Sequence, residues 1–102
     1  MTSPTHATLV TFRVDLSREA EQREQLKRMI LPGVRQFPGF VVGYWTLDRQ
    51  ASESFVLLRY DSLAAAEAMS ENVRGNAQNQ RAVGLELLDV RILEIAASAS
   101  SP

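Results

Sequence analysis

The sequence predicts one small α+β domain with the element order βαββαβ. Three observations predict it: four short segments rich in β-branched and aromatic residues, two segments with apolar residues at three- and four-residue spacing, and turn-forming residues between them. The chain has 102 residues, which is room for one core, since domains cluster near roughly 100 to 150 residues. We therefore expect a single domain over residues 1–102, with its core between residues 7 and 95.

The first strand and the first helix are predicted in the N-terminal third of the chain. Leu9 to Val14 alternate in parity and are rich in β-branched side chains, which is typical of a strand. Ser17 offers an N-cap oxygen for a helix that ends at Phe37. Because proline lacks an N–H, we expect Pro32-Gly33 to kink this helix or to convert its last turn. Its apolar face is predicted at Leu26, Met29, Ile30, Val34 and Phe37.

A hairpin is predicted in the middle of the chain. Phe40 to Leu47 form a nearly continuous apolar run, and Phe55 to Tyr60 form a second one. The polar segment from Asp48 to Ser54 separates them and has the composition of a turn. These two runs are therefore the second and third strands.

The second helix and the last strand complete the domain. Asp61-Ser62 can cap a helix that ends at Gly75-Asn76. The polar segment Asn76 to Arg81 is expected to be a connection, and Leu85 to Ile95 the fourth strand. We expect this helix to carry Leu63, Ala66, Met69, Ser70 and Val73 on one side.

Two strand-helix-strand crossings joined by a hairpin give the ferredoxin-like layout with a four-stranded antiparallel sheet. Right-handed crossovers place both helices on one face, so no helix covers the other face. A sheet with one wet face alternates apolar and polar residues. Both parities of the second strand are apolar instead, with Val42 and Tyr44 on one and Trp45 and Leu47 on the other.

This double-sided apolar pattern predicts a homodimer. Leaving about eight apolar side chains in water forgoes roughly 1.5 to 3 kcal/mol apiece, a sum comparable to the roughly 5 to 15 kcal/mol stability of a whole domain. A second copy packed sheet to sheet about a two-fold axis would cover them. The competing interpretation is that one parity is only half buried at the sheet edges.

Charge and hydropathy exclude several partners. Eleven basic and twelve acidic residues give a formal charge of -1, and neither sign forms a long block. Phosphate binding needs a concentrated positive face, so we expect no nucleic-acid partner. No apolar stretch approaches the roughly 18 residues that span a bilayer, and residues 1–7 lack a signal pattern. We expect a cytoplasmic protein with no membrane partner.

The residue inventory also restricts the chemistry. The chain has no cysteine and one histidine, His6, whereas thiolate sites and the common histidine metal sites need more of these residues. We therefore expect no metal and no cofactor. His6 is expected in a poorly ordered lead, where a dangling side chain is a better interpretation than a catalytic base.

Two longer signatures resemble the dimeric α/β-barrel superfamily, which includes the antibiotic biosynthesis monooxygenases and heme-degrading monooxygenases. They are LPGVRQFPGFVVGYW (Leu31 to Trp45) and FVLLRYDSLAAAEAM (Phe55 to Met69), within a match from Ala7 to Ile95. The resemblance implies a ferredoxin-like subunit, a barrel built from two sheets, and a pocket between each sheet and its own helices. Cofactor-free oxygenation of an electron-rich aromatic substrate is one activity that it implies.

The residues used by heme-degrading relatives are not matched. Those relatives carry a tryptophan and a histidine on the second helix and an asparagine on the first strand. This sequence has Met69 and Asn79 near the helix positions, and Thr11 or Phe12 on the strand. Heme breakdown is therefore not expected.

Two adjacent aromatic residues are candidates for the site. Tyr44 and Trp45 follow one another on a strand, so their rings point to opposite faces and only one can line a given pocket. A strand tryptophan is more often part of a core or an interface, although a buried indole N–H needs a partner and that partner could be a ligand.

The polar candidates lie on the strands. Arg13 and Arg59 are cations within apolar strands, where a guanidinium needs a carboxylate or a substrate oxyanion. Asp89 on the last strand is an available partner, and a structural pair is favoured over a substrate clamp. Tyr60 could donate its hydroxyl to a bound carbonyl or to water, and water is favoured.

The leading hypothesis is a cofactor-independent monooxygenase acting on a small aromatic or polyketide-like substrate. It assigns catalysis to Trp45, Arg59 and Tyr60, and substrate binding to Tyr44, Met69 and Asn72. The alternative is a non-catalytic homodimer that binds a small apolar ligand or serves in a stress response, which the sparse set of titratable residues favours. A solvated Asn72 is the simpler interpretation of that residue.

Overall fold

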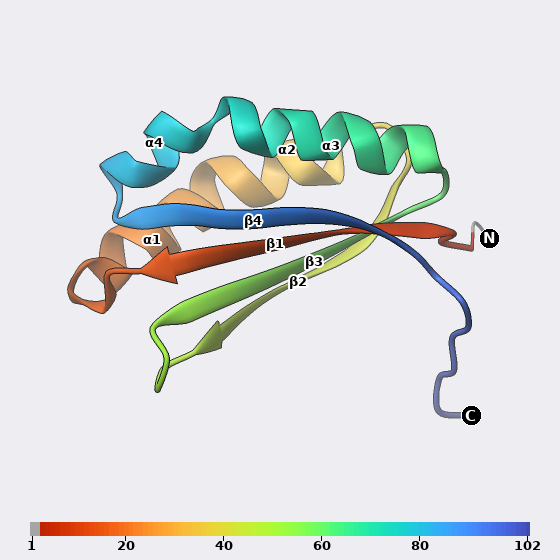
Figure 1. Cartoon of the computed structure of the whole chain (residues 1–102), viewed down its shortest axis with the longest axis horizontal. Coiled ribbons are helices and arrows are strands. Elements are labelled where there is room, and N and C mark those ends of the chain that lie inside the picture. Colours follow the sequence, from red (N-terminus) through yellow and green to blue (C-terminus); the bar gives the residue numbers. More distant parts are fainter. Residues whose placement is uncertain (1–2) are drawn as a thin grey trace.

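The computed structural model describes residues 3–102. It confirms the α+β ferredoxin-like fold, with one antiparallel sheet in the strand order β2-β3-β1-β4. All helices of residues 3–102 lie on one face of this sheet, and no helix or strand of these residues covers the opposite face (Figure 1). The elements are β1 (His6–Val14), α1 (Glu19–Gln25), α2 (Leu31–Arg35), β2 (Phe40–Asp48), β3 (Glu53–Tyr60), α3 (Leu63–Gly75), α4 (Ala77–Ala82) and β4 (Leu85–Glu94).

The first strand is longer than predicted and its helix begins differently. β1 starts at His6 rather than Leu9 because it pairs along its whole length with β3 and β4. The prediction that His6 lies in a poorly ordered lead is therefore wrong. Ser17 is not the N-cap, because the Asp15 carboxylate accepts its backbone N–H at 3.1 Å and opens a short 3-10 turn, Leu16–Arg18.

A π-helical turn, Leu26–Ile30, joins α1 to α2 directly before Pro32. The Leu31 N–H donates to the Leu26 carbonyl five residues back. The predicted irregularity near Pro32-Gly33 is confirmed, but it lies in the preceding turn, and the helix ends at Arg35 instead of Phe37. Because a π turn breaks the 3.6-residue period, Met29 is 62% exposed and does not belong to the predicted buried face.

The second helical segment follows the prediction at both ends. Ser62 caps α3 by accepting the Ala65 N–H at 3.1 Å, and α3 ends at Gly75. The connection predicted after it is helical instead. The Gln80 side chain donates to the carbonyl of Val73 at 3.0 Å, and this bond fastens α4 to the end of α3.

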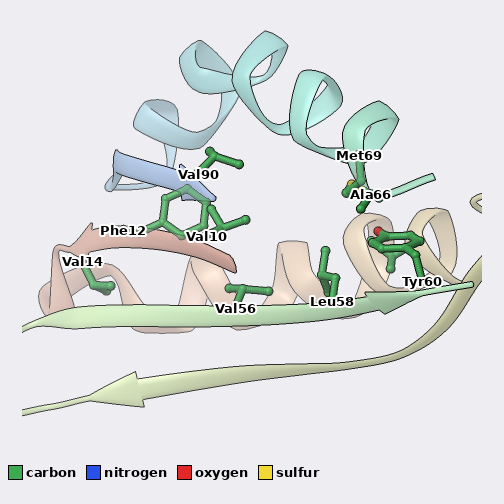
Figure 2. Close-up of a cluster of buried hydrophobic side chains, with 10 residues drawn as sticks. Val10, Phe12, Val14, Val56, Leu58, Tyr60, Ala66, Met69 and Val90 are labelled. Atoms are coloured by element: carbon green, nitrogen blue, oxygen red, sulfur yellow. The ribbon is translucent and has the colours of Figure 1, made fainter. Parts of the chain in front are cut away.

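The core lies between the sheet and the helices. Val10 on β1 faces Val56 on β3 and Val90 on β4 in the register of the sheet, and these side chains are buried. Ala66 and Met69 of α3 close the core over Tyr60, whose ring lies directly beneath them (Figure 2). The buried Thr8 hydroxyl donates to the Ala66 carbonyl at 2.9 Å, which ties α3 to the centre of the sheet. The parity that contains these residues is therefore the helix-facing one.

Candidate functional site

A groove lined mainly by apolar residues lies between α2 and the edge strand β2. Its volume is about 490 Å³, within the range of small-molecule sites, roughly 300 to 1,000 Å³. We call it the α2–β2 groove. Its lining residues are Leu31, Val34, Arg35, Phe40, Val41, Val42, Gly43 and Trp45.

The groove exists because β2 is irregular and contains a glycine. Phe40 pairs with Tyr60 and Val42 with Arg59, so Val41 is an extra residue that forms a bulge in the edge strand. A Cβ on Gly43 would lie 2.7 Å from Leu58 Cδ2, 3.2 Å from Trp45 Cζ3 and 3.3 Å from Phe40 Cε1. The missing side chain therefore lets Leu58 and the rings of Trp45 and Phe40 pack directly against the β2 backbone, and this packing places both rings at the groove.

Trp45 lines this groove, whereas its neighbour Tyr44 does not. Trp45 lies opposite Val56 on the helix-facing side of the sheet, whereas Tyr44 lies opposite Leu57 on the uncovered side. The prediction that the two rings point to opposite faces is confirmed. Trp45 carries the only neutral hydrogen-bond donor among the side chains that line the groove.

Arg35 is the only charged residue that lines the groove. Within residues 3–102, six of the basic side chains form ion pairs with carboxylates, and Arg35 is not among them. It stands near the C-terminal end of α2 and is exposed. The groove thus combines apolar walls with one unopposed cation.

Tyr60 lies behind the groove rather than in water. Its side chain is fully buried, and its hydroxyl has no hydrogen-bond partner among the described residues. The rings of Phe37 and Phe40 pack edge-on against it, with centroids 6.2 Å and 5.8 Å away. Burial raises the Tyr60 pKa well above its usual range. The preference for a water-facing hydroxyl is therefore wrong, because the aromatic cluster and α3 exclude solvent.

Met69 and Asn72 occupy different environments on α3. Met69 is 2% exposed and belongs to the core above Tyr60 (Figure 2). Asn72 is exposed, and its amide contacts the Met69 sulfur at 3.7 Å. Neither residue lines the α2–β2 groove.

Arg59 lies on the uncovered face of the sheet, on the side away from Trp45. Its guanidinium carbon is 5.7 Å from the centre of the Tyr44 ring, and its Nε is buried without a hydrogen-bond partner among residues 3–102. Asp89, the expected partner of Arg59 or Arg13, instead binds Arg91 at 2.6 Å. Arg13 reaches Glu86 at 3.5 Å. The expected Arg–Asp pair is therefore wrong, because Asp89 and Arg91 are neighbours of the same parity on β4.

The uncovered face is also apolar, as the sequence predicts. Tyr44 is 52% exposed there and Phe55 and Leu93 are each 38% exposed. The register of the four strands assigns this face the apolar residues Ala7, Leu9, Val42, Tyr44, Phe55, Leu57 and Leu93. We call this surface the open sheet face.

The six predicted site residues are thus divided between two faces. Trp45 and Tyr60 lie on the helix side and are linked through Phe40, whereas Tyr44 and Arg59 meet on the open sheet face. Sequence reasoning did not identify Arg35, Phe40 or Gly43 as groove residues. One signal was available, since a glycine inside an apolar strand often marks a place where another group approaches the backbone.

A second, smaller hollow of about 280 Å³ lies where β1 ends and β4 begins. It contains Arg13 and Arg81 but also Asp15 and Glu86, so its charges oppose one another. Residues 3–102 contain no group of three histidine, cysteine, aspartate or glutamate residues arranged to hold a metal ion. In the same range, no helix has the length and apolar composition needed to cross a bilayer.

Comparison with known proteins extends this description. Neither a protein-family model nor a curated protein matches the sequence. A monooxygenase from the gene ActVA-Orf6 of Streptomyces coelicolor, solved in complex with nanaomycin D, is 13% identical with a TM-score of 0.72, over 97% of this chain and 94% of that one. A protein from Deinococcus radiodurans assigned as an antibiotic biosynthesis monooxygenase is 16% identical with a TM-score of 0.64, over 95% and 96%.

A third structure, Rv0793 from Mycobacterium tuberculosis, is 23% identical with a TM-score of 0.56, over 98% of this chain and 100% of that one. The structural neighbours include antibiotic biosynthesis monooxygenase-like proteins, in agreement with the resemblance seen in the sequence. The shared feature is the fold, a four-stranded antiparallel sheet with helices on one face.

Proposed function

We propose that this chain is a cytoplasmic, single-domain homodimer that binds a small aromatic or polyketide-like molecule in the α2–β2 groove and oxygenates it without a cofactor. The observation that carries the proposal is Trp45 in the wall of an apolar groove of about 490 Å³. The fold similarity to a monooxygenase solved with nanaomycin D supports it.

The groove suits a flat aromatic ligand. Phe40 and Trp45 both line it, so a planar ring can lie against aromatic side chains between apolar walls. The Trp45 N–H is available to donate to an oxygen of the ligand, and Tyr60 stiffens the site from behind through Phe40. Trp45 is therefore the residue that we place against the reacting ring, and Tyr60 is a positioning residue.

An electron-rich anion can reduce dioxygen directly. The ionised substrate, such as an anthrone enolate, transfers one electron to dioxygen, and the two radicals combine to form a carbon–oxygen bond. The resulting hydroperoxide loses water and leaves a carbonyl, so substrate and dioxygen become quinone and water. The chain contributes binding, orientation and exclusion of bulk water. Because no acid or base with an ordinary neutral-range pKa lines the groove, the substrate has to be acidic enough to ionise in water.

The homodimer is part of this proposal. The open sheet face presents Tyr44, Phe55 and Leu93 to solvent in the single chain, and burying such side chains favours association. On the same face, the buried Nε of Arg59 has no hydrogen-bond acceptor among residues 3–102. A second copy packed on this face would shield the apolar side chains.

A non-catalytic ligand-binding homodimer is the second candidate. It is favoured by the absence of a histidine, aspartate or glutamate that could act as a general base among the groove residues. The two candidates share the groove and the dimer and differ only in the reaction with dioxygen.

Oxygen uptake separates these candidates. Purified protein is mixed with anthrones and hydroquinones, dioxygen is followed with an electrode, and products are identified by mass spectrometry. We expect a product that has gained one oxygen and lost two hydrogens, formed faster with wild type than with Trp45→Ala. Tyr44→Phe, which changes the adjacent residue on the opposite face, is the matched control. Ligand binding without oxygen uptake across the panel would establish the non-catalytic candidate instead.

A further inference from the structure

The charge of the α2–β2 groove has a single source. Apart from Arg35, every residue that lines the groove is apolar or a glycine. No carboxylate of residues 3–102 lies within 4.0 Å of Arg35 in an ion pair, whereas Arg18, Arg23 and Arg49 are all paired with glutamates elsewhere. A ligand in the groove therefore meets an uncompensated cation at one end and aromatic walls along its length.

From this we infer that Arg35 selects planar aromatic acids, with its guanidinium binding the ligand carboxylate while the ring system lies along β2 toward Trp45. This inference rests on the proposed function and adds a substrate class and a specificity-determining residue to it. A guanidinium matches a carboxylate with two parallel N–H donors, which gives orientation as well as affinity.

The position of Arg35 relative to Trp45 explains why orientation matters. Arg35 is on the helix wall of the groove and Trp45 is on the strand wall. A carboxylate held at Arg35 fixes one end of the ligand, so only ring positions along the groove floor contact Trp45. Neutral aromatics fill the same apolar space without this constraint. Arg35 thus determines which carbon of the ring meets the oxygenating environment.

The apolar walls of the groove hold a ring system next to Arg35, whose own side chain is exposed. Its pairing with a carboxylate is therefore a charge-assisted hydrogen bond at the surface, which salt screens. Arg81, by contrast, lines a hollow that also contains Asp15 and Glu86. An aromatic acid at Arg81 would meet these carboxylates. Arg81 therefore serves as a matched control, an exposed arginine outside the groove.

The single tryptophan of the chain supplies a direct readout. Anthraquinone-2-carboxylate and its neutral analogue, anthraquinone-2-carboxamide, absorb where tryptophan emits and so quench a nearby indole. Both are titrated into the full-length protein, and quenching of Trp45 gives the dissociation constants. We expect the acid to bind wild type at least about tenfold more tightly than the amide, in line with a charge-assisted hydrogen bond.

The variant Arg35→Gln is expected to lose about tenfold in affinity for the acid and to bind the amide as wild type does. Arg35→Lys keeps the charge but not the paired donors, so its affinity for the acid should lie between that of wild type and that of Arg35→Gln. Arg81→Gln should leave both constants unchanged. Raising the salt concentration should weaken binding of the acid but not binding of the amide.

The possible results separate this inference from the proposed function. Equal affinity for acid and amide, or an Arg35→Gln variant that binds the acid as wild type does, would overturn the role of Arg35 and leave the aromatic groove intact. Absence of Trp45 quenching by either compound would overturn both. Loss of acid binding in Arg81→Gln but not in Arg35→Gln would move the anion site to the other hollow and refute the inference.

Discussion

The guanidinium of Arg59 lies 5.7 Å from the centre of the Tyr44 ring on the face of the sheet that no helix covers. This pair places a cation among apolar side chains, with its Nε buried and without a hydrogen-bond partner among residues 3–102. A face of this kind is typical of an interface rather than of a solvated surface, because large exposed apolar patches mark interaction sites.

Tyr44→Lys is expected to convert the proposed dimer into a monomer. Tyr44 is 52% exposed in the single chain, so the change should not unfold the subunit, but an ammonium buried between two sheets beside the Arg59 guanidinium lacks a compensating charge. We expect dimer affinity to fall about 100-fold or more, measured by analytical ultracentrifugation with circular dichroism as the folding check. The control is Leu63→Lys, since Leu63 is 47% exposed on the helix side. A monomeric wild type at micromolar concentration would contradict the dimer.

Tyr60→Phe is expected to leave the free energy of unfolding unchanged or to raise it by about 1 kcal/mol. The Tyr60 hydroxyl is buried without a partner among the described residues, and such a group carries a desolvation penalty of roughly 1 to 3 kcal/mol. Chemical denaturation measures the difference. Tyr60→Ala is the reference for lost packing and should cost about 3 to 5 kcal/mol. A marked loss of stability in Tyr60→Phe would reveal a hydrogen bond to the hydroxyl.

The same tyrosine predicts an alkaline loss of stability. Burial raises the Tyr60 pKa above its ordinary value of 10.0, so the folded state keeps the phenol proton after the unfolded state has lost it. Stability is therefore unaffected below pH 10 and falls as pH rises above it, by up to about 1.4 kcal/mol per pH unit. Urea denaturation of wild type and Tyr60→Phe across this range should show a difference that grows with pH. Parallel curves would contradict a raised pKa.

The ion pairs of Glu19 should make the stability of the protein depend on pH in the acid range. Its carboxylate binds Arg49 through two N–H donors at 2.9 Å and also pairs with Arg23, which lowers the pKa of Glu19 to about 2. Because the pKa of Glu19 is lowered in the folded state, its ion pairs contribute stability above the ordinary carboxyl pKa of 4.5, and this contribution is lost as pH falls toward 2. An NMR titration of the Glu19 carboxyl should give this low midpoint, and Arg49→Gln should raise it. A midpoint near 4.5 in wild type would show that the pairing is absent in solution.

The sequence predicts the strands and faces well because their signals are local. A two-residue alternation assigns Tyr44 and Trp45 to opposite faces without knowledge of the fold, and the structure agrees. The cap at Ser62 is also a local signal, since a side-chain oxygen before an apolar helical pattern is sufficient to predict it. These features require no information about distant residues.

The candidate site is less predictable because tertiary packing decides it. The bulge at Val41 depends on how Phe40 and Val42 pair with β3, and all three residues line the groove. Tyr60 ends a strand next to polar residues, which favours a solvated hydroxyl, but the rings of Phe37 and Phe40 enclose it. No local pattern indicates that enclosure.

Two glycines test how the groove is made. Gly33 lies in α2 with no atom within 4 Å of an added Cβ, so Gly33→Ala should raise the free energy of unfolding by about 0.5 to 1 kcal/mol through the better helix propensity of alanine. Gly43→Ala places a methyl group 2.7 Å from Leu58 Cδ2 and close to the Trp45 ring. Because Leu58 is buried and cannot move freely, this change should destabilise the protein by about 1 to 3 kcal/mol.

The same pair separates stability from binding. Gly43→Ala should also weaken the quenching of Trp45 by an aromatic ligand, because the added methyl group would displace the rings of Trp45 and Phe40 that line the α2–β2 groove. Gly33→Ala should leave the dissociation constant unchanged, although both variants add one methyl group. If both variants bind the ligand equally well while Gly43→Ala remains folded, the ligand does not lie against these two rings, and the proposed position of its ring system is wrong.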